Sequence, residues 1–153
     1  MKTTPINDEE LKKLWQENWS YIKTIVDIST EPALILDKKL SVITATKPFY
    51  EIFGLIKKET VGKTLSTVGD GQWNIVTLLT LLKEIQIKET TLKAFPVSAF
   101  FPLRGNKNML LNARMIHNHK KVAHSSLVLI IIEDITEVMK VADQVAKQLL
   151  KRQ

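Results

Sequence analysis

The sequence has no cysteine among its 153 residues. This absence excludes disulfide bonds, thiolate nucleophiles and cysteine-based zinc sites. The first ten residues are polar and acidic and lack the apolar run of a secretory signal, so we expect a cytoplasmic protein. The apolar run at residues 127–132 is far shorter than the roughly 20 residues that cross a bilayer. With 44% hydrophobic and 25% charged residues, the composition is that of one soluble domain with flanking helices.

Acidic residues are missing from residues 91–132, which hold six of the 22 basic residues. The other 16 basic residues balance the 16 acidic ones, so the whole net charge of +6 lies in this segment, together with all three histidines. Such a basic surface suits nucleic acid, an anionic ligand or an acidic partner domain, and it equally suits a solvated sheet face. No aromatic residues alternate with the basic ones as they do where bases stack, which argues against nucleic acid.

Residues 127–132 are apolar and rich in β-branched side chains, which predicts a strand covered on both faces. The hydrophobic period then changes to that of a helix. Asp134 and Glu137 have the spacing of a capping box at its start. Its apolar residues recur at alternating steps of three and four, as in a coiled coil: Ile135, Val138, Ala142, Val145 and Leu149.

The pattern of the first 134 residues predicts a long flanking helix followed by short strands and short helical segments. Asn7 and Glu10 have the spacing of a capping box for the flanking helix, and Pro32 ends it. Its broad apolar stripe, with Trp15 and Trp19, suits the outer face of a sheet or a second subunit. The elements that follow are strands at 33–37, 41–45, 91–101, 107–117 and 127–132, and helical segments at 47–53, 57–61 and 75–85.

Particular residues mark the ends of these elements. Gly54 ends the first short helix, and Asn74, after a loop with two glycines, is the expected cap of the helix at 75–85. Pro96 lacks the N–H of a ladder residue, so its strand belongs at a sheet edge or contains a bulge.

Several of these stretches resemble PAS domains, the small sensor modules found in front of bacterial histidine kinases and other output domains. Asp134-Ile135-Thr136 resembles the Asp-Ile-Thr ending of these domains. Phe49 to Gly54 is similar to their Phe-x-x-x-Phe-Gly pattern. The Gly-x-Gly-Gln-Trp loop at 69–73 and Met-Leu-Leu-Asn-Ala-Arg at 109–114 resemble a PAS subgroup common in sensor kinases.

The resemblance covers residues 21–137 and implies an α+β fold. We expect a five-stranded antiparallel sheet with helices on one face, the last strand central and the Pro96 strand at one edge. It also implies three parts: a long N-terminal flanking helix at 1–28, a PAS core at 29–134, and a coiled-coil-like signalling helix at 135–153.

The residues give little support to a catalytic site or a metal site. His117 and His119 share strand parity, but His124 lies beyond a loop and no carboxylate is close in sequence, so we expect no metal site. Haem-binding PAS domains take their ligand from the helix that corresponds to 75–85, which has no histidine, and covalent flavin needs a cysteine. Haem and covalent flavin are therefore not expected, whereas this argument leaves non-covalent flavin open. Neither long helix contains a phosphoacceptor histidine, so we expect no enzyme activity in this chain.

PAS domains often hold a small ligand between sheet and helices. The candidate liners, each of which also suits a plain core, are Phe49, Tyr50, Phe53, Trp73, Leu78, Leu82, Asn112 and Arg114. Arg114 needs a partner if it is buried, and a bound carboxylate is one candidate. The alternative places it on the outer sheet face.

The sequence therefore predicts a PAS sensor and dimerisation domain. Asp134, Ile135 and Thr136 are the expected relay residues, and Val138, Ala142, Val145 and Leu149 the expected homodimer seam. The heptad spacing continues as far as Leu149, which suggests an output domain such as a two-component histidine kinase. The alternatives are a ligandless protein-docking module and a binder of nucleic acid or anionic partners through the basic segment.

Overall fold

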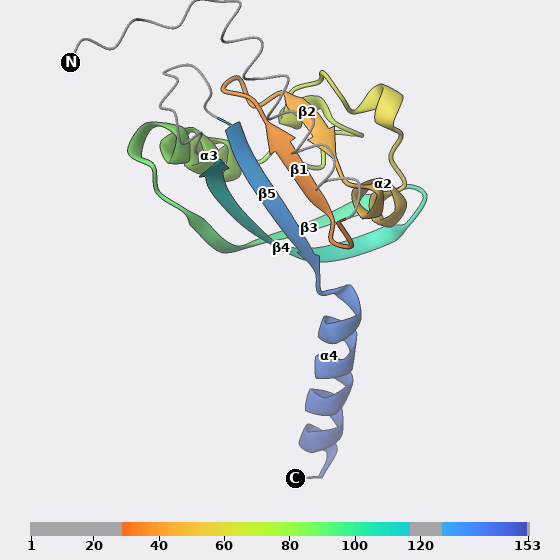
Figure 1. Ribbon diagram of the computed structural model, residues 1–153. Coiled ribbons are helices and arrows are strands. Elements are labelled where there is room, and N and C mark those ends of the chain that lie inside the picture. The colour runs from red at the N-terminus through yellow and green to blue at the C-terminus, as the bar shows by residue number, and fades with distance from the viewer. Residues whose placement is uncertain (1–28, 117–126, 153) are drawn as a thin grey trace, which may run out of the picture.

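The computed structural model describes residues 29–116 and 127–152, which form a five-stranded sheet with helices (Figure 1). The strand order is β2-β1-β5-β4-β3, and every neighbouring pair is antiparallel. The strands are β1 (Ala33–Leu36), β2 (Val42–Ala45), β3 (Leu92–Phe101), β4 (Gly105–Ile116) and β5 (Leu127–Asp134). The helices are α2 (Lys47–Phe53), α3 (Val76–Lys88) and α4 (Thr136–Lys151), with two 3₁₀ turns, η1 (Lys57–Glu59) and η2 (Leu65–Thr67). The predicted α+β architecture is confirmed.

The predicted flanking helix at 1–28, with Trp15 and Trp19, lies outside the described residues, as do His117, His119 and His124. The predicted role of the flanking helix in covering the sheet or a second subunit, and the expected absence of a histidine metal site, therefore stay predictions.

The central position of β5 and the edge position of β3 confirm two predictions from sequence. β5 pairs with β1 on one side and β4 on the other. β3 pairs with β4 alone within the described residues, so the missing N–H of Pro96 does not interrupt an internal ladder. The register of β3 also shifts between Leu92 and Phe95, where Ala94 adopts a φ of 51°. This bulge lies just before the proline.

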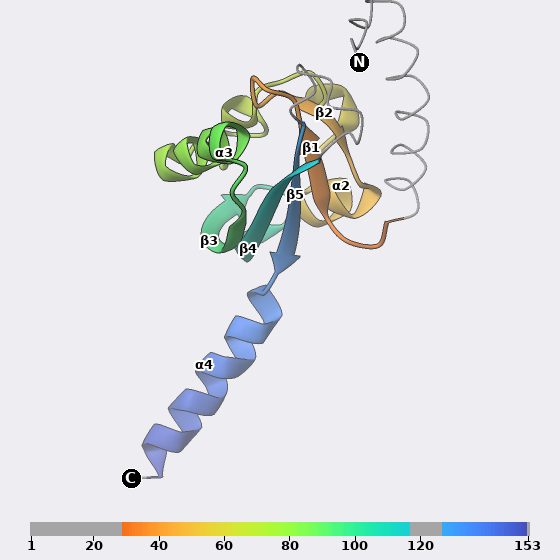
Figure 2. The ribbon, with the colours of Figure 1, turned by 60° about the vertical axis from the view of Figure 1, so that its left-hand side comes forward.

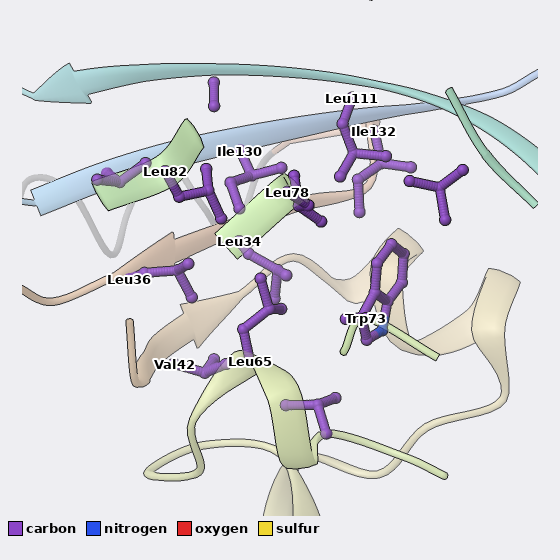
Figure 3. Packing of buried hydrophobic residues seen from close by; sticks show 14 of the residues in the cluster. Leu34, Leu36, Val42, Leu65, Trp73, Leu78, Leu82, Leu111, Ile130 and Ile132 are labelled. Atoms are coloured by element: carbon purple, nitrogen blue, oxygen red, sulfur yellow. The ribbon is translucent and has the colours of Figure 1, made fainter. Parts of the chain in front are cut away.

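The core lies between one face of the sheet and the helical segments (Figure 3). Sheet residues such as Leu34 and Ile130 meet Leu78 and Leu82 of α3 and Leu65 of η2, and all five are at most 1% exposed. Burial of a leucine or isoleucine side chain contributes about 1.5–3 kcal/mol, so this cluster supplies much of the folding free energy.

The short helix α2 ends as predicted. Gly54 adopts the left-handed conformation (φ 64°), and its N–H donates to the Tyr50 carbonyl. A Cβ at Gly54 would lie 2.9 Å from the Cβ of Leu103, so glycine is required for its conformation and also for the close approach of the β3–β4 turn.

Two expected helix caps are wrong. α3 begins after Ile75, which has no side-chain cap bond, so Asn74 does not cap it. The N–H of Asn74 instead donates to the Gly71 carbonyl within the glycine loop. α4 begins after Ile135, because β5 continues to pair with β4 as far as Asp134. Asp134 therefore lies one residue before the N-cap position, although its carboxylate accepts the N–H of Thr136, the first residue of the helix.

Candidate functional site

An aromatic cluster lies between the sheet and the helices. Phe49, Phe53 and Trp73 are at most 1% exposed, and their ring centroids lie 5.2–6.2 Å apart. Phe101 of β3, which the sequence did not single out, joins them with its centroid 4.8 Å from that of Phe53. Leu78 and Leu82 are also fully buried. These predicted liners therefore pack against one another as core residues.

Two polar atoms in this region have no hydrogen-bond partner among the described residues: the Tyr50 hydroxyl and the Trp73 Nε1–H. Burial raises the pKa of the Tyr50 phenol above its usual value, so the hydroxyl stays protonated. A buried donor without a partner costs about 1–3 kcal/mol. Trp73 thus supplies apolar area to the core at the expense of an unpaired N–H.

Asn112 and Arg114 do not line this space, which corrects the prediction for both. Leu111 and Ala113 of β4 point into the core, so the alternation of the strand places Asn112 and Arg114 on the opposite, exposed face. The Asn112 side chain accepts a hydrogen bond from the backbone N–H of Ala94 at the β3 bulge. Arg114 lies beside Leu129 on the outer face of the sheet and needs no buried anion as a partner.

The predicted relay residues Asp134, Ile135 and Thr136 form a joint between β5 and α4. Asn108 of β4 holds this joint from its own backbone: its N–H donates to the Thr136 hydroxyl (3.0 Å), and its carbonyl accepts from the Ile135 N–H (2.8 Å). Lys107 adds an ion pair with Asp134 (3.3 Å), in which both side chains are partly buried. We call these five residues the joint.

The carboxylate of Asp134 is the polar centre of the joint. Burial raises its pKa, but hydrogen bonds from the hydroxyl and the backbone N–H of Thr136, together with the Lys107 charge, outweigh burial and hold the pKa below its ordinary value. Asp134 is therefore ionised at neutral pH. The Glu137 side chain pairs with Lys140 instead of completing the predicted capping box.

From the joint, α4 projects away from the sheet domain (Figure 2). The predicted seam residues Val138, Val145 and Leu149 are 67%, 50% and 61% exposed, and Ala142 is also exposed. At 100° per residue all the apolar side chains of α4 fall on one half of the helix surface, which leaves the other half polar. Nothing in the described part of the chain covers this apolar face.

Asn108 and Lys107 are functional candidates that sequence reasoning missed. They lie 27–28 positions from their partners in α4 and β5, so only the β4–β5 register brings them together. Neither residue belongs to a local motif, and the sequence holds no signal that would have found them.

Comparison of the structure with solved proteins identifies its fold. An LOV protein of Rhodobacter sphaeroides superposes with a TM-score of 0.64 at 14% identity, over 79% of this chain and 68% of that one. A PAS domain of an HTR-like protein from Haloarcula marismortui superposes with a TM-score of 0.53 at 14% identity, over 83% and 99% of the two chains. The fold is a PAS fold.

An RNA-binding light-oxygen-voltage receptor matches 99% of this chain with 41% of its own, at 10% identity and a TM-score of 0.64. No protein-family model matches the sequence, and none of the curated proteins matches it. At these identities the likeness of this chain to its structural neighbours concerns the fold alone.

Residues 29–116 and 127–152 contain no group of three or more His, Asp or Glu side chains arranged to hold a metal ion. Within the same residues, no helix is both long enough and apolar enough to cross a membrane.

Proposed function

We propose that this PAS domain is a non-enzymatic sensor that dimerises through α4 and transmits a signal through the joint to an output domain. The observation that carries the proposal is the contrast between the two ends of α4. Its first turn is fixed to β4 and β5, whereas its apolar face is exposed along its whole length.

The proposed occupant of the apolar face is α4 of a second copy of this chain. Val138, Ala142, Val145 and Leu149 follow the alternating spacing of three and four residues by which coiled-coil helices interlock. Each valine or leucine that becomes fully buried contributes about 1.5–3 kcal/mol. Burial of these side chains in two copies of the seam would thus work against the entropy cost of association.

The joint is the proposed route from the sheet to that seam. Because β5 is the central strand, a change in its pairing with β1 or β4 shifts the position of Asp134. Asn108 fixes the first residues of α4 from the neighbouring strand. A movement of β4 against β5 would therefore alter the orientation of the helix and its pairing with the partner helix.

The kind of output domain and the kind of ligand are also part of the proposal. The heptad of α4 suits a two-component histidine kinase in the cytoplasm, in which a coiled coil joins the sensor to the kinase. The structural neighbours differ in what they bind: a structure of VqmA is described as bound to DPO, and another neighbour is an RNA-binding receptor. A small-molecule ligand is thus in keeping with the fold, and the absence of nucleic-acid binding stays a prediction.

A ligandless docking module is the second candidate function, and the aromatic cluster favours it. Phe49, Phe53, Trp73 and Phe101 occupy the region in which a ligand between sheet and helices would lie. In that case a protein partner, and not a small molecule, would act on the joint.

Native mass spectrometry of the purified chain, before and after mild unfolding, tests these proposals together. A dimer that releases extra mass on unfolding supports the sensor, and the mass difference gives the ligand's weight. A dimer without extra mass supports the docking module. A monomer at micromolar concentration contradicts dimerisation through α4 and with it the proposed relay.

A further inference from the structure

A groove of about 310 Å³ lies outside the aromatic cluster, between the β1–β2 turn, η2 and α3. Its floor is apolar: Leu40, Leu65 and Leu79 lie beneath it, and the first two are at most 5% exposed. This volume is at the lower end of the range for small-molecule sites. The groove is therefore large enough for a short organic ligand.

Backbone and side-chain bonds hold the walls of the groove in place. The Lys83 ammonium of α3 donates to the Lys38 carbonyl (3.0 Å), and the Gln86 amide donates to the Asp37 carbonyl (3.1 Å), so α3 is tied to the β1–β2 turn. The Leu65 N–H donates to the Leu40 carbonyl (2.9 Å), which ties η2 to the same turn. The groove is thus formed without any ligand.

The polar lining of the groove carries positive charge and hydroxyls, and no carboxylate. Lys39 and Lys83 lie at its rim with Thr64, Ser66 and Thr80. None of the ion pairs among the described residues involves either lysine. Lys83 uses one N–H on the Lys38 carbonyl and keeps two donors, whereas Lys39 keeps three.

We propose that this groove binds a small carboxylate with a short aliphatic body. The carboxylate lies between the Lys39 and Lys83 ammonium groups, within reach of the Ser66 hydroxyl, and the aliphatic body lies on the three leucines. Two separated cations above an apolar floor match an amphipathic anion better than a neutral molecule or a bare inorganic ion.

The groove also has a path to the joint, and this part of the inference rests on the proposed function. The β1–β2 turn continues into β1, where Leu36 pairs with Val128 of β5, and β5 leads to Asp134 and α4. A ligand that draws the turn and α3 together would act on the central strand without entering the packed core.

Binding is tested on the full 153-residue chain by titration with hexanoate, observed as amide shifts in ¹⁵N–¹H NMR spectra. The expected shifts map to residues 38–41, 64–66 and 79–83 and saturate. Acetate should bind at least about tenfold more weakly, since two buried methylenes alone contribute that factor. Hexanamide, which has the same body without the charge, and inorganic phosphate, which has charge without the body, should also bind more weakly.

Variants that remove one lysine charge test whether Lys39 and Lys83 hold the carboxylate. Lys39→Gln and Lys83→Gln should each weaken hexanoate binding by about fivefold, the upper value for an exposed ion pair. Lys88→Gln, which removes an exposed lysine from the same helix outside the groove, should leave binding unchanged. Equal binding of hexanoate and hexanamide, shifts confined to the aromatic cluster, tighter binding of phosphate, or no binding at millimolar hexanoate would overturn the proposal.

The Val145→Lys variant separates this inference from dimerisation. Because Val145 is on α4, away from the groove, the variant should bind hexanoate as the unaltered chain does even if it is monomeric. Loss of hexanoate binding in this variant would contradict a self-contained groove, whereas retained binding would support it whatever the subunit count.

Discussion

Asp134 shows how the surroundings of one residue set its part in the joint. Its carboxylate accepts two hydrogen bonds from Thr136 and faces the Lys107 ammonium at 3.3 Å. These contacts favour the charged form and lower the pKa of the carboxyl. A carboxyl whose pKa is lower in the folded state than in the unfolded state stabilises the fold fully at pH values above its unfolded pKa. This stabilisation is lost as the pH falls through the folded pKa.

Because the pKa of Asp134 is lowered in the folded state, the effect of Asp134→Asn on stability should depend on pH. The unaltered chain should be more stable than the variant by about 1 kcal/mol at neutral pH, since the variant loses the ion pair with Lys107. This difference should be fully present above the ordinary pKa of 3.8 and should disappear as the pH falls through the lowered value. Urea denaturation of both chains between pH 7 and pH 2.5 measures it. A difference that grows towards low pH would contradict the assignment.

Trp73 provides a second prediction at the residue scale. Trp73→Ala should lower the free energy of unfolding by about 3–5 kcal/mol, because it leaves a cavity in the aromatic cluster. Trp73→Phe keeps a ring and removes the unpaired N–H, so its cost should be below about 1.5 kcal/mol. Denaturation followed by circular dichroism compares the two variants. A loss of stability in Trp73→Phe as large as that in Trp73→Ala would contradict this expectation.

At the scale of elements, the joint decides how firmly α4 is attached to the sheet. Thr136→Val preserves the shape of the side chain but removes the acceptor of the Asn108 N–H. We expect faster hydrogen exchange at Asn108 and in the first turn of α4, with unchanged protection in β1 and β5, because only the joint loses a bond. Thr67→Val, which removes an exposed hydroxyl bonded within its own turn, is the matched control. Faster exchange throughout the sheet would indicate a role in the core instead.

The elements that were predictable from sequence are those fixed by local sterics and hydrophobic period. Pro96 lacks an N–H and therefore marked an edge strand, and the apolar run of β5 marked the central strand. The β4 alternation separated Leu111 from Asn112 and Arg114, but both faces of that strand carry apolar residues. Parity alone therefore did not show which face the helices cover, and the expected cavity role of Asn112 and Arg114 was wrong.

Helix starts and the joint were less predictable for a tertiary reason. Asp134 has the residue type of a cap, yet its backbone remains in the β5 ladder opposite Met109 and only its side chain reaches Thr136. The contact with Asn108 depends on the register of two strands whose connection lies at 117–126. No local pattern in the sequence encodes that register.

On the scale of the whole molecule, the chain combines a packed core of PAS fold with a helix, α4, whose apolar face is not covered by any of the residues that the structure describes. An apolar face of this length is expected to be covered in the functional state, and its heptad spacing favours a second copy of the same helix. A charge placed on that face should oppose association, whereas the same charge on the polar face should have no effect. Val145 lies on the apolar half of α4 and the adjacent Gln144 on its polar half, so the two offer a matched pair.

Sedimentation equilibrium of the unaltered chain, Val145→Lys and Gln144→Lys therefore tests the central claim most directly. The unaltered chain and Gln144→Lys should sediment as dimers at micromolar concentration with similar dissociation constants. Val145→Lys should be monomeric there, weakened by about 100-fold or more, because each dimer would bury two unpaired ammonium groups in an apolar seam. A monomeric unaltered chain, or a Val145→Lys variant that dimerises as tightly as Gln144→Lys, would contradict dimerisation through α4.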